Sequence, residues 1–137
     1  MMSRFRIVVA LAVLLPGLAL ADGKVPLPQE THINEQLIAG AAGDILRKEC
    51  PKIEARLLVV WGKLFDLKSY AESKGYTEAE VKAFLQDADQ KARVKAAAMA
   101  YLAAAGAKAG DRASYCSVGK SEIAKGTLLG SLIKSGE

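Results

Sequence analysis

The stretch LRKECPKIEAR, residues 46–56, contains the feature that decides the fold, Cys50 followed by Pro51. The second of the two cysteines, Cys116, lies far along the chain in YCSVGKSEI, residues 115–123. Proline is favoured at the first position of a helix, where its missing N–H costs no hydrogen bond. We therefore expect one helix to end at Cys50 and the next to begin at Pro51. A bond between the cysteines would close a loop long enough to stabilise the fold by about 4 kcal/mol.

The N-terminus has the features of a secretory signal peptide. Arg4 and Arg6 precede an apolar run over residues 7–15, and Ala19-Leu20-Ala21 supplies the small residues that precede a cleavage point. A helix that spans a membrane needs about 20 apolar residues, so this run is too short to be an anchor. We predict a signal peptide over residues 1–21 and a periplasmic or secreted protein.

The charge of the remaining chain argues against a nucleic-acid partner. Of the 19 lysines and arginines, two lie in the signal peptide, which leaves 17 against 15 acidic residues, a net charge of +2. The two signs alternate along the chain, as in Lys48-Glu49. Such a pattern is typical of solvated helix faces and not of a basic binding patch.

In an oxidising compartment two cysteines usually form a structural bond. We therefore predict a disulfide between Cys50 and Cys116, with a switchable redox pair as the alternative. The chain has no C-x-x-C motif, which excludes thioredoxin-like exchange and c-type haem attachment.

Hydrophobic periodicity predicts an all-α fold, a compact domain of four or five helices over residues 31–137, after an extended leader over 22–30. Thr31 is the expected cap of a first helix that ends at Glu49. A second helix over 52–74, ended by Gly75, is expected to be central, because Leu57-Leu58-Val59-Val60-Trp61 is apolar nearly all round. We interpret Trp61 as a core residue, with the lining of a ligand pocket as the alternative.

The clearest local signal is a capping box at Thr77-Glu78-Ala79-Glu80, with Tyr76 placed to pack on Val81. Asp87 offers a second cap for a helix that ends at Gly106, and Asp111 can cap a last helix over 112–134. No strand is expected.

The expected last helix has two apolar stripes. One contains Cys116 and must face the core if the disulfide forms; the other consists of Val118, Leu129 and Leu132. Two alternatives follow for the second stripe. Either the alanine-rich helix ending at Ala105 covers it, or it is a docking surface for a partner helix.

Four short stretches resemble a known family: Leu46–Arg56 around Cys50-Pro51, GYTEAE at 75–80, YLAAAG at 101–106, and YCSVGKSEI at 115–123. The chain is similar to small exported alphaproteobacterial proteins grouped as a domain of unknown function. This resemblance implies a signal peptide and a helical domain with paired cysteines. It implies no activity, ligand or catalytic residue.

No pattern in the sequence points to an enzyme. His32, the only histidine, begins the first helix and is interpreted as a surface residue, whereas nucleophilic catalysis needs an oriented imidazole. The carboxylate pairs Glu78 with Glu80 and Asp87 with Asp89 are explained by capping. We expect no catalytic residue, no metal site and no cofactor.

The sequence favours a non-enzymatic protein-interaction module of the bacterial envelope, such as an accessory subunit, an inhibitor or an immunity-type protein. A periplasmic stress chaperone and a carrier of an apolar ligand are the alternatives. The expected partner is a protein of the envelope; no nucleic acid and no membrane span of the mature chain are expected, and the oligomeric state is left open.

Overall fold

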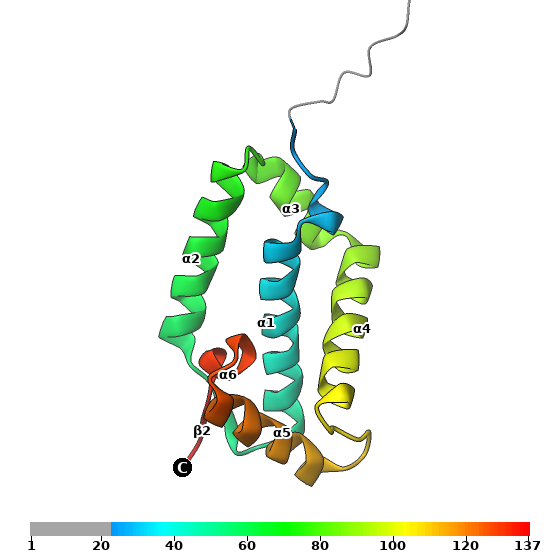
Figure 1. The fold of residues 1–137 in the computed structure, drawn as a ribbon, viewed down its shortest axis with the longest axis vertical. Helices are drawn as coiled ribbons and strands as arrows, with labels where there is room; N and C mark the ends of the chain where they lie inside the picture. The colour runs from blue at the N-terminus through cyan, green and yellow to red at the C-terminus, as the bar shows by residue number, and fades with distance from the viewer. Residues whose placement is uncertain (1–22) are drawn as a thin grey trace, which may run out of the picture.

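The structure is a computed structural model and describes residues 23–137, so the predicted signal peptide lies outside the described residues. In that part of the chain, six α-helices and one pair of short strands follow a single 3-10 turn (Figure 1). The elements are η1 (Leu27–Gln29), α1 (Thr31–Glu49), β1 (Ile53–Ala55), α2 (Leu57–Ser73), α3 (Glu78–Gln86), α4 (Ala88–Ala104), α5 (Arg112–Lys125), α6 (Leu128–Leu132) and β2 (Ile133–Ser135). The prediction of a compact helical fold is confirmed.

The central helix is α1, which lies between α2 and α4 while α5 crosses below it (Figure 1). Its buried face includes the small residues Ala39, Ala42 and Gly43, which let neighbouring helices approach closely. Gly43 lies against Leu129 and Ile133 at ordinary contact distance. The prediction that the second helix is central is therefore wrong.

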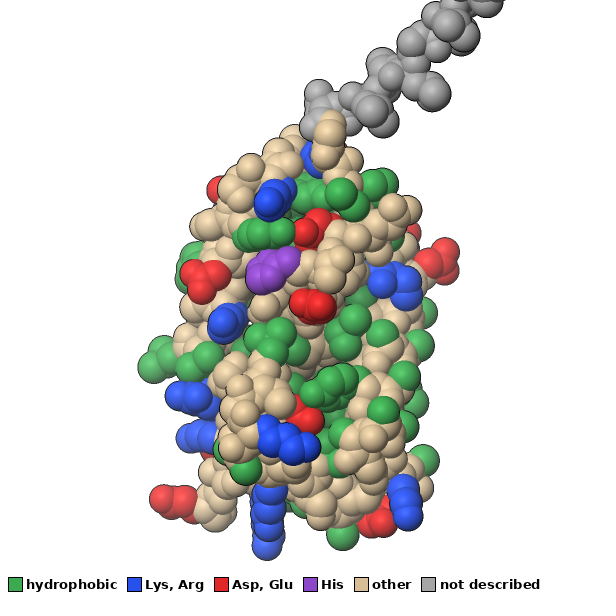
Figure 2. Space-filling view, viewed as in Figure 1, with side chains coloured by type: hydrophobic (Ala, Val, Ile, Leu, Met, Phe, Trp, Pro, Cys, Tyr) green, Lys and Arg blue, Asp and Glu red, His purple; other side chains and the backbone are tan. Residues whose placement is uncertain are grey.

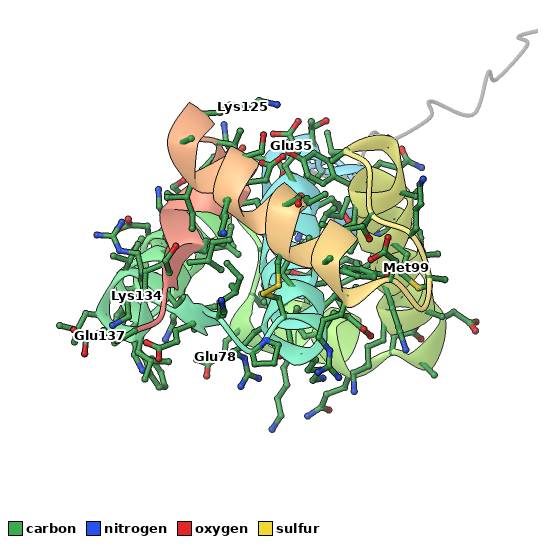
Figure 3. All side chains as sticks on the ribbon, turned by 90° about the horizontal axis from the view of Figure 1, so that it is seen from below. Glu35, Glu78, Met99, Lys125, Lys134 and Glu137 are labelled. Carbon is green, nitrogen blue, oxygen red and sulfur yellow. A yellow bond between two sulfur atoms is a disulfide. The ribbon has the colours of Figure 1, made fainter. Side chains whose placement is uncertain are left out.

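The main core lies where α1, α4, α5 and α6 meet. Its buried residues are Ala42, Leu46, Cys50, Ile53, Ala98, Leu102, Val118, Leu129 and Ile133. The predicted disulfide is present: Cys50 and Cys116 are bonded with an S–S distance of 2.00 Å. Seen from below, it links the end of α1 to α5 (Figure 3). Cys50 is fully buried, so the bond is part of this core.

The chain reverses where a single last helix was predicted. Gly126 ends α5 in the left-handed conformation, with φ at 63°, and Thr127 then caps α6 by accepting the Gly130 N–H at 3.0 Å. After α6 the chain forms β2, which pairs antiparallel with β1 in the register Ile53 with Ser135 and Ala55 with Ile133. The predictions of one helix over 112–134 and of no strand are wrong.

Local capping signals account for most of the other helix boundaries. The capping box of Thr77 and Glu80 is present, Asp87 accepts the Gln90 N–H, and Asp111 accepts the Ser114 N–H. Gly75 and Gly106 both have positive φ, as expected of helix stops. The cap of α1 differs from the prediction, because Glu30 and not Thr31 accepts the Ile33 N–H, at 2.6 Å.

The segment before α1 is more structured than the extended leader that the sequence predicts. Leu27 is buried in a second core with Ile33, Ala71, Tyr76 and Phe84. Lys24 contacts the α3 end of the molecule, with its Nζ 2.8 Å from the Glu80 carboxylate, and the Tyr76 hydroxyl donates to the Val25 carbonyl. These polar contacts and the buried leucine hold residues 24–30 against α3 and the turn before it.

The Lys24 contact also changes the titration of Glu80. The pKa of Glu80 is lowered from 4.5 to about 2. The largest cause is the hydrogen bond from Lys24, and the next is the hydrogen bond from the Thr77 N–H. Because the folded pKa is lower than the unfolded one, the contribution of this carboxylate to stability is present above pH 4.5 and is lost as the pH falls through about 2.

Reducing the disulfide is expected to lower the free energy of unfolding by about 2–5 kcal/mol, because the bond closes a long loop in the unfolded chain. Urea denaturation of the oxidised protein and of the protein in excess reductant measures this difference. Equal midpoints for the two forms would contradict the structural role of the bond.

Gly130→Ala is expected to destabilise the protein by about 2–3 kcal/mol, because overpacking forces backbone to move. An added Cβ would lie only 2.0 Å from the Glu122 carbonyl oxygen. Gly40→Ala is the matched control: its Cβ would meet nothing within 4 Å, so the gain in helix propensity should stabilise by about 0.5–1 kcal/mol. Thermal melts of the two variants should move in opposite directions.

Glu80→Gln is expected to reduce stability at neutral pH and to have little effect below pH 2, since the wild-type carboxylate is then protonated. Denaturant titrations of both proteins across this pH range provide the measurement. Glu78→Gln, in the same helical turn, serves as the control. If the difference in stability between the wild type and Glu80→Gln does not shrink as the pH falls, the contact between Lys24 and Glu80 is not what stabilises this end of α3.

Candidate functional site

In residues 23–137, the histidine and carboxylate side chains considered as catalytic candidates lie apart from one another or cap helices. His32 is exposed and lies beside Tyr70, with ring centroids 4.3 Å apart. Glu80 and Asp87 cap helices, as described above. Within residues 23–137, no three His, Cys, Asp or Glu side chains are grouped so that they could hold a metal ion. The same residues include no helix that is long and apolar enough to cross a membrane.

One carboxylate, Glu122, is buried between α4, α5 and α6. It accepts a hydrogen bond from the Tyr101 hydroxyl at 2.9 Å and another from the Thr127 hydroxyl. Burial, and then the bond to Glu122, raises the pKa of Tyr101 above its ordinary value. One donor lies on α4 and the other is the residue that caps α6. Glu122 therefore stabilises the turn between α5 and α6.

The predicted partner surface is not available on the outside of the molecule. Val118, Leu129 and Leu132 are 3%, 2% and 7% exposed. Because the chain turns at Gly126, Leu129 and Leu132 lie on a separate short helix that packs on α1 and not along the outer side of one long helix. The stripe is therefore buried, but chiefly against α1 and not by the alanine-rich helix of the first alternative.

The exposed apolar residues gather instead on α2. Five large side chains are at least half exposed, from 50% for Leu64 to 89% for Leu58. We call them the α2 face: Leu57, Leu58, Trp61, Leu64 and Phe65. In Figure 2 hydrophobic side chains project from the edge of the molecule along which α2 runs. The interpretation of Trp61 as a core residue is therefore wrong.

The α2 face exists because α2 is apolar on two sides and uses only one for the core. Ala71 is buried and Leu67 partly buried on the side toward α1 and α3. Leu58, Trp61 and Phe65 recur at steps of three and four residues and so lie together on another side. The apolar block at residues 57–61 is the sequence signal for this second side. Such a block predicts burial, but it does not show whether the chain's own core or a partner covers it.

Polar contacts fix α2 at its two ends. At the C-terminal end, the Tyr70 hydroxyl donates to Glu30 at 2.7 Å, and this bond holds the pKa of Tyr70 above its ordinary value. Just before the helix begins, the Arg56 N–H donates to the Leu132 carbonyl at 2.9 Å and its guanidinium to the Ser131 carbonyl. A helix held at both ends presents its outer face in a defined position.

Two hollows lie beside the α2 face. The upper one, between α1, α2 and α3, has a volume of about 400 Å³, and most of its lining is apolar. The lower one, of about 720 Å³, lies between α1, the start of α2 and β2. Leu64 lines the upper hollow and Leu57 the lower one, so the α2 face continues into both.

Comparison with known proteins gives one match. Residues 25–134 match the model of a family described as a family of unknown function, DUF5333. No curated protein matches the chain, and no solved structure does. Because the match includes both cysteines, all six helices and the α2 face, the chain belongs to the family of unknown function DUF5333.

Proposed function

We propose that the protein is a non-enzymatic interaction module of the bacterial envelope that binds another protein through the α2 face. The observation that carries this proposal is the exposure of five large apolar side chains on one helix. Monomeric proteins seldom expose a contiguous apolar patch larger than a few hundred Å², and larger patches mark interaction sites.

The size of the α2 face supports a protein partner. An aromatic side chain buries roughly 150–250 Å² when it is covered. Trp61 and Phe65 are 59% and 68% exposed, so the two together offer roughly 200–300 Å², to which the three exposed leucines add. One side of a standard protein–protein interface buries about 800 Å², so this helix supplies a substantial share of what one partner needs.

An extracytoplasmic location is part of the proposal. A structural disulfide is typical of oxidising compartments, and the Cys50–Cys116 bond is compatible with one. The signal peptide predicted over residues 1–21 would deliver the chain there.

The upper hollow favours a second candidate, a carrier of an apolar ligand. Ligand sites have volumes of about 300–1,000 Å³ and mostly apolar walls, and the hollow between α1, α2 and α3 has both properties. A carrier would retain a small apolar molecule through purification, and native mass spectrometry would detect its added mass. Detection of such a ligand in this hollow would favour the carrier over the interaction module.

Site-specific photo-crosslinking in the envelope of living cells tests the proposal. A photoreactive residue at position 58, the most exposed part of the α2 face, should form one discrete protein adduct after illumination. Position 99 is the control, because Met99 is also an exposed apolar residue but lies on α4, away from α2 (Figures 1 and 3).

No adduct at position 58, or equal adducts at 58 and 99, would overturn the interaction module. A broad ladder of many adducts at position 58 would instead indicate the stress chaperone, which contacts many clients.

A further inference from the structure

We propose that the α2 face binds the α2 face of a second copy of the same chain, with the two helices antiparallel and a two-fold axis between Trp61 and Gly62. This inference rests on the proposed function and names its partner. It starts from Gly62, which the folded chain alone does not explain.

Gly62 lies in the middle of α2 and is exposed. Glycine is among the least favourable residues in a helix interior, and close packing is the usual reason for it. Gly43, Gly119 and Gly130 are packed in this way, whereas a Cβ at Gly62 would meet nothing within 4 Å. Gly40 is also exposed and open, but it lies on α1, where it lines the lower hollow. Gly62 is the one glycine of α2, and it lies among the exposed apolar residues of that helix.

Gly62 forms a depression between large apolar side chains. Residues at i, i+3, i+4 and i+7 outline a diamond on a helix surface, and such a diamond is the hole that accepts a side chain of a facing helix. Here the four positions are Leu58, Trp61, Gly62 and Phe65. The absent side chain at position 62 makes this hole deep enough for a large aromatic side chain, and Trp61 stands beside it.

This arrangement is complementary to itself. When two copies of α2 run antiparallel about an axis between positions 61 and 62, each Trp61 lies opposite the Gly62 of the other copy. Each Leu58 then lies opposite a Phe65. A two-fold interface brings the same patch of both copies together and so needs a self-complementary surface of this kind. A different protein as partner would not require a large side chain at position 61 and a gap that accepts it at position 62.

Area and charge both permit the association. In two α2 faces the four aromatic side chains alone offer roughly 400–600 Å² and the six leucines add to this, which suits a small and weak interface. None of the four diamond positions carries a charge, and the net charge of the chain after residue 21 is only +2. Two copies therefore repel each other only weakly.

A lipid surface fits less well. Helices that lie on membranes carry an excess of Lys and Arg on their polar side. The charged residues of α2 are balanced, with Lys63 and Lys68 against Asp66 and Glu72. A membrane also gives no reason for a glycine between Leu58 and Phe65.

Sedimentation equilibrium tests the inference on protein expressed from the complete sequence and purified after export. The wild type should show a monomer–dimer equilibrium with a dissociation constant in the micromolar range. Leu58→Glu should abolish the dimer, because a charge would be buried in the interface. Met99→Glu, on α4, should leave the dissociation constant within about twofold.

Gly62→Leu is the decisive variant. Filling the hole should weaken the dimer by at least about tenfold, while the melting temperature of the dilute monomer should stay the same or rise, since leucine favours the helix more than glycine does. A role of Gly62 in folding alone would instead lower the melting temperature of the variant and leave the dissociation constant unchanged.

The inference is overturned if the wild type remains monomeric up to about 200 µM, far above a micromolar dissociation constant. It is also overturned if Gly62→Leu dimerises as tightly as the wild type, or if a monomeric protein floats with vesicles of phosphatidylethanolamine and phosphatidylglycerol and Leu58→Glu does not. A monomer that still gives a discrete adduct to a different protein from position 58 would refute self-association and leave the proposed function standing.

Discussion

The fold is held together at the buried junction where Cys50, at the end of α1, is bonded to Cys116 on α5. Neither β1 nor α6 buries enough apolar surface to hold its place alone, because each is only three to five residues long. The covalent bond keeps α5 against α1, and the turn at Gly126 then directs α6 back onto α1. The β1–β2 pair closes the same region by joining residues that are far apart in the sequence.

Close approach of backbone makes that junction compact. A Cβ on Gly119 would lie 2.8 Å from the Ile53 side chain, and one on Gly130 would overlap the Glu122 carbonyl. These glycines cost helix propensity but allow α5, α6 and the first strand to meet without a gap. Buried Glu122 adds to this by accepting hydroxyl hydrogen bonds from both sides of the turn.

The α2 face follows from the small size of the molecule. The main core, built on α1, is filled by apolar residues from α4, α5 and α6. Helix α2 contributes chiefly Leu67, Tyr70 and Ala71, from its C-terminal end, to the second core. The remaining large side chains of α2 have no place in that core and stay on the surface. Such exposure carries a risk of aggregation that a covering partner removes, which is why the proposed function and the proposed self-association both start from this helix.

Features that depend on near neighbours can be predicted from the amino-acid sequence. The capping box at Thr77, the cap at Asp87 and the stop at Gly75 involve residues within four positions of one another, so their pattern predicts them directly. The disulfide was predictable for a different reason, since a chain with two cysteines has one pairing within itself. These signals were enough for a helical fold and for most helix boundaries.

The side of each helix that faces inward depends on long-range packing, which local sequence patterns do not specify. Periodicity shows that α2 has two apolar sides, but its distance from α1, and therefore the exposure of Trp61, depends on contacts with residues far along the chain. The same holds for Leu129 and Leu132, whose burial follows from the reversal at Gly126, and for β1, whose partner strand comes from the last residues of the chain. Short-range patterns carry no information on such pairings, because the free energy that selects them comes from packing between distant segments.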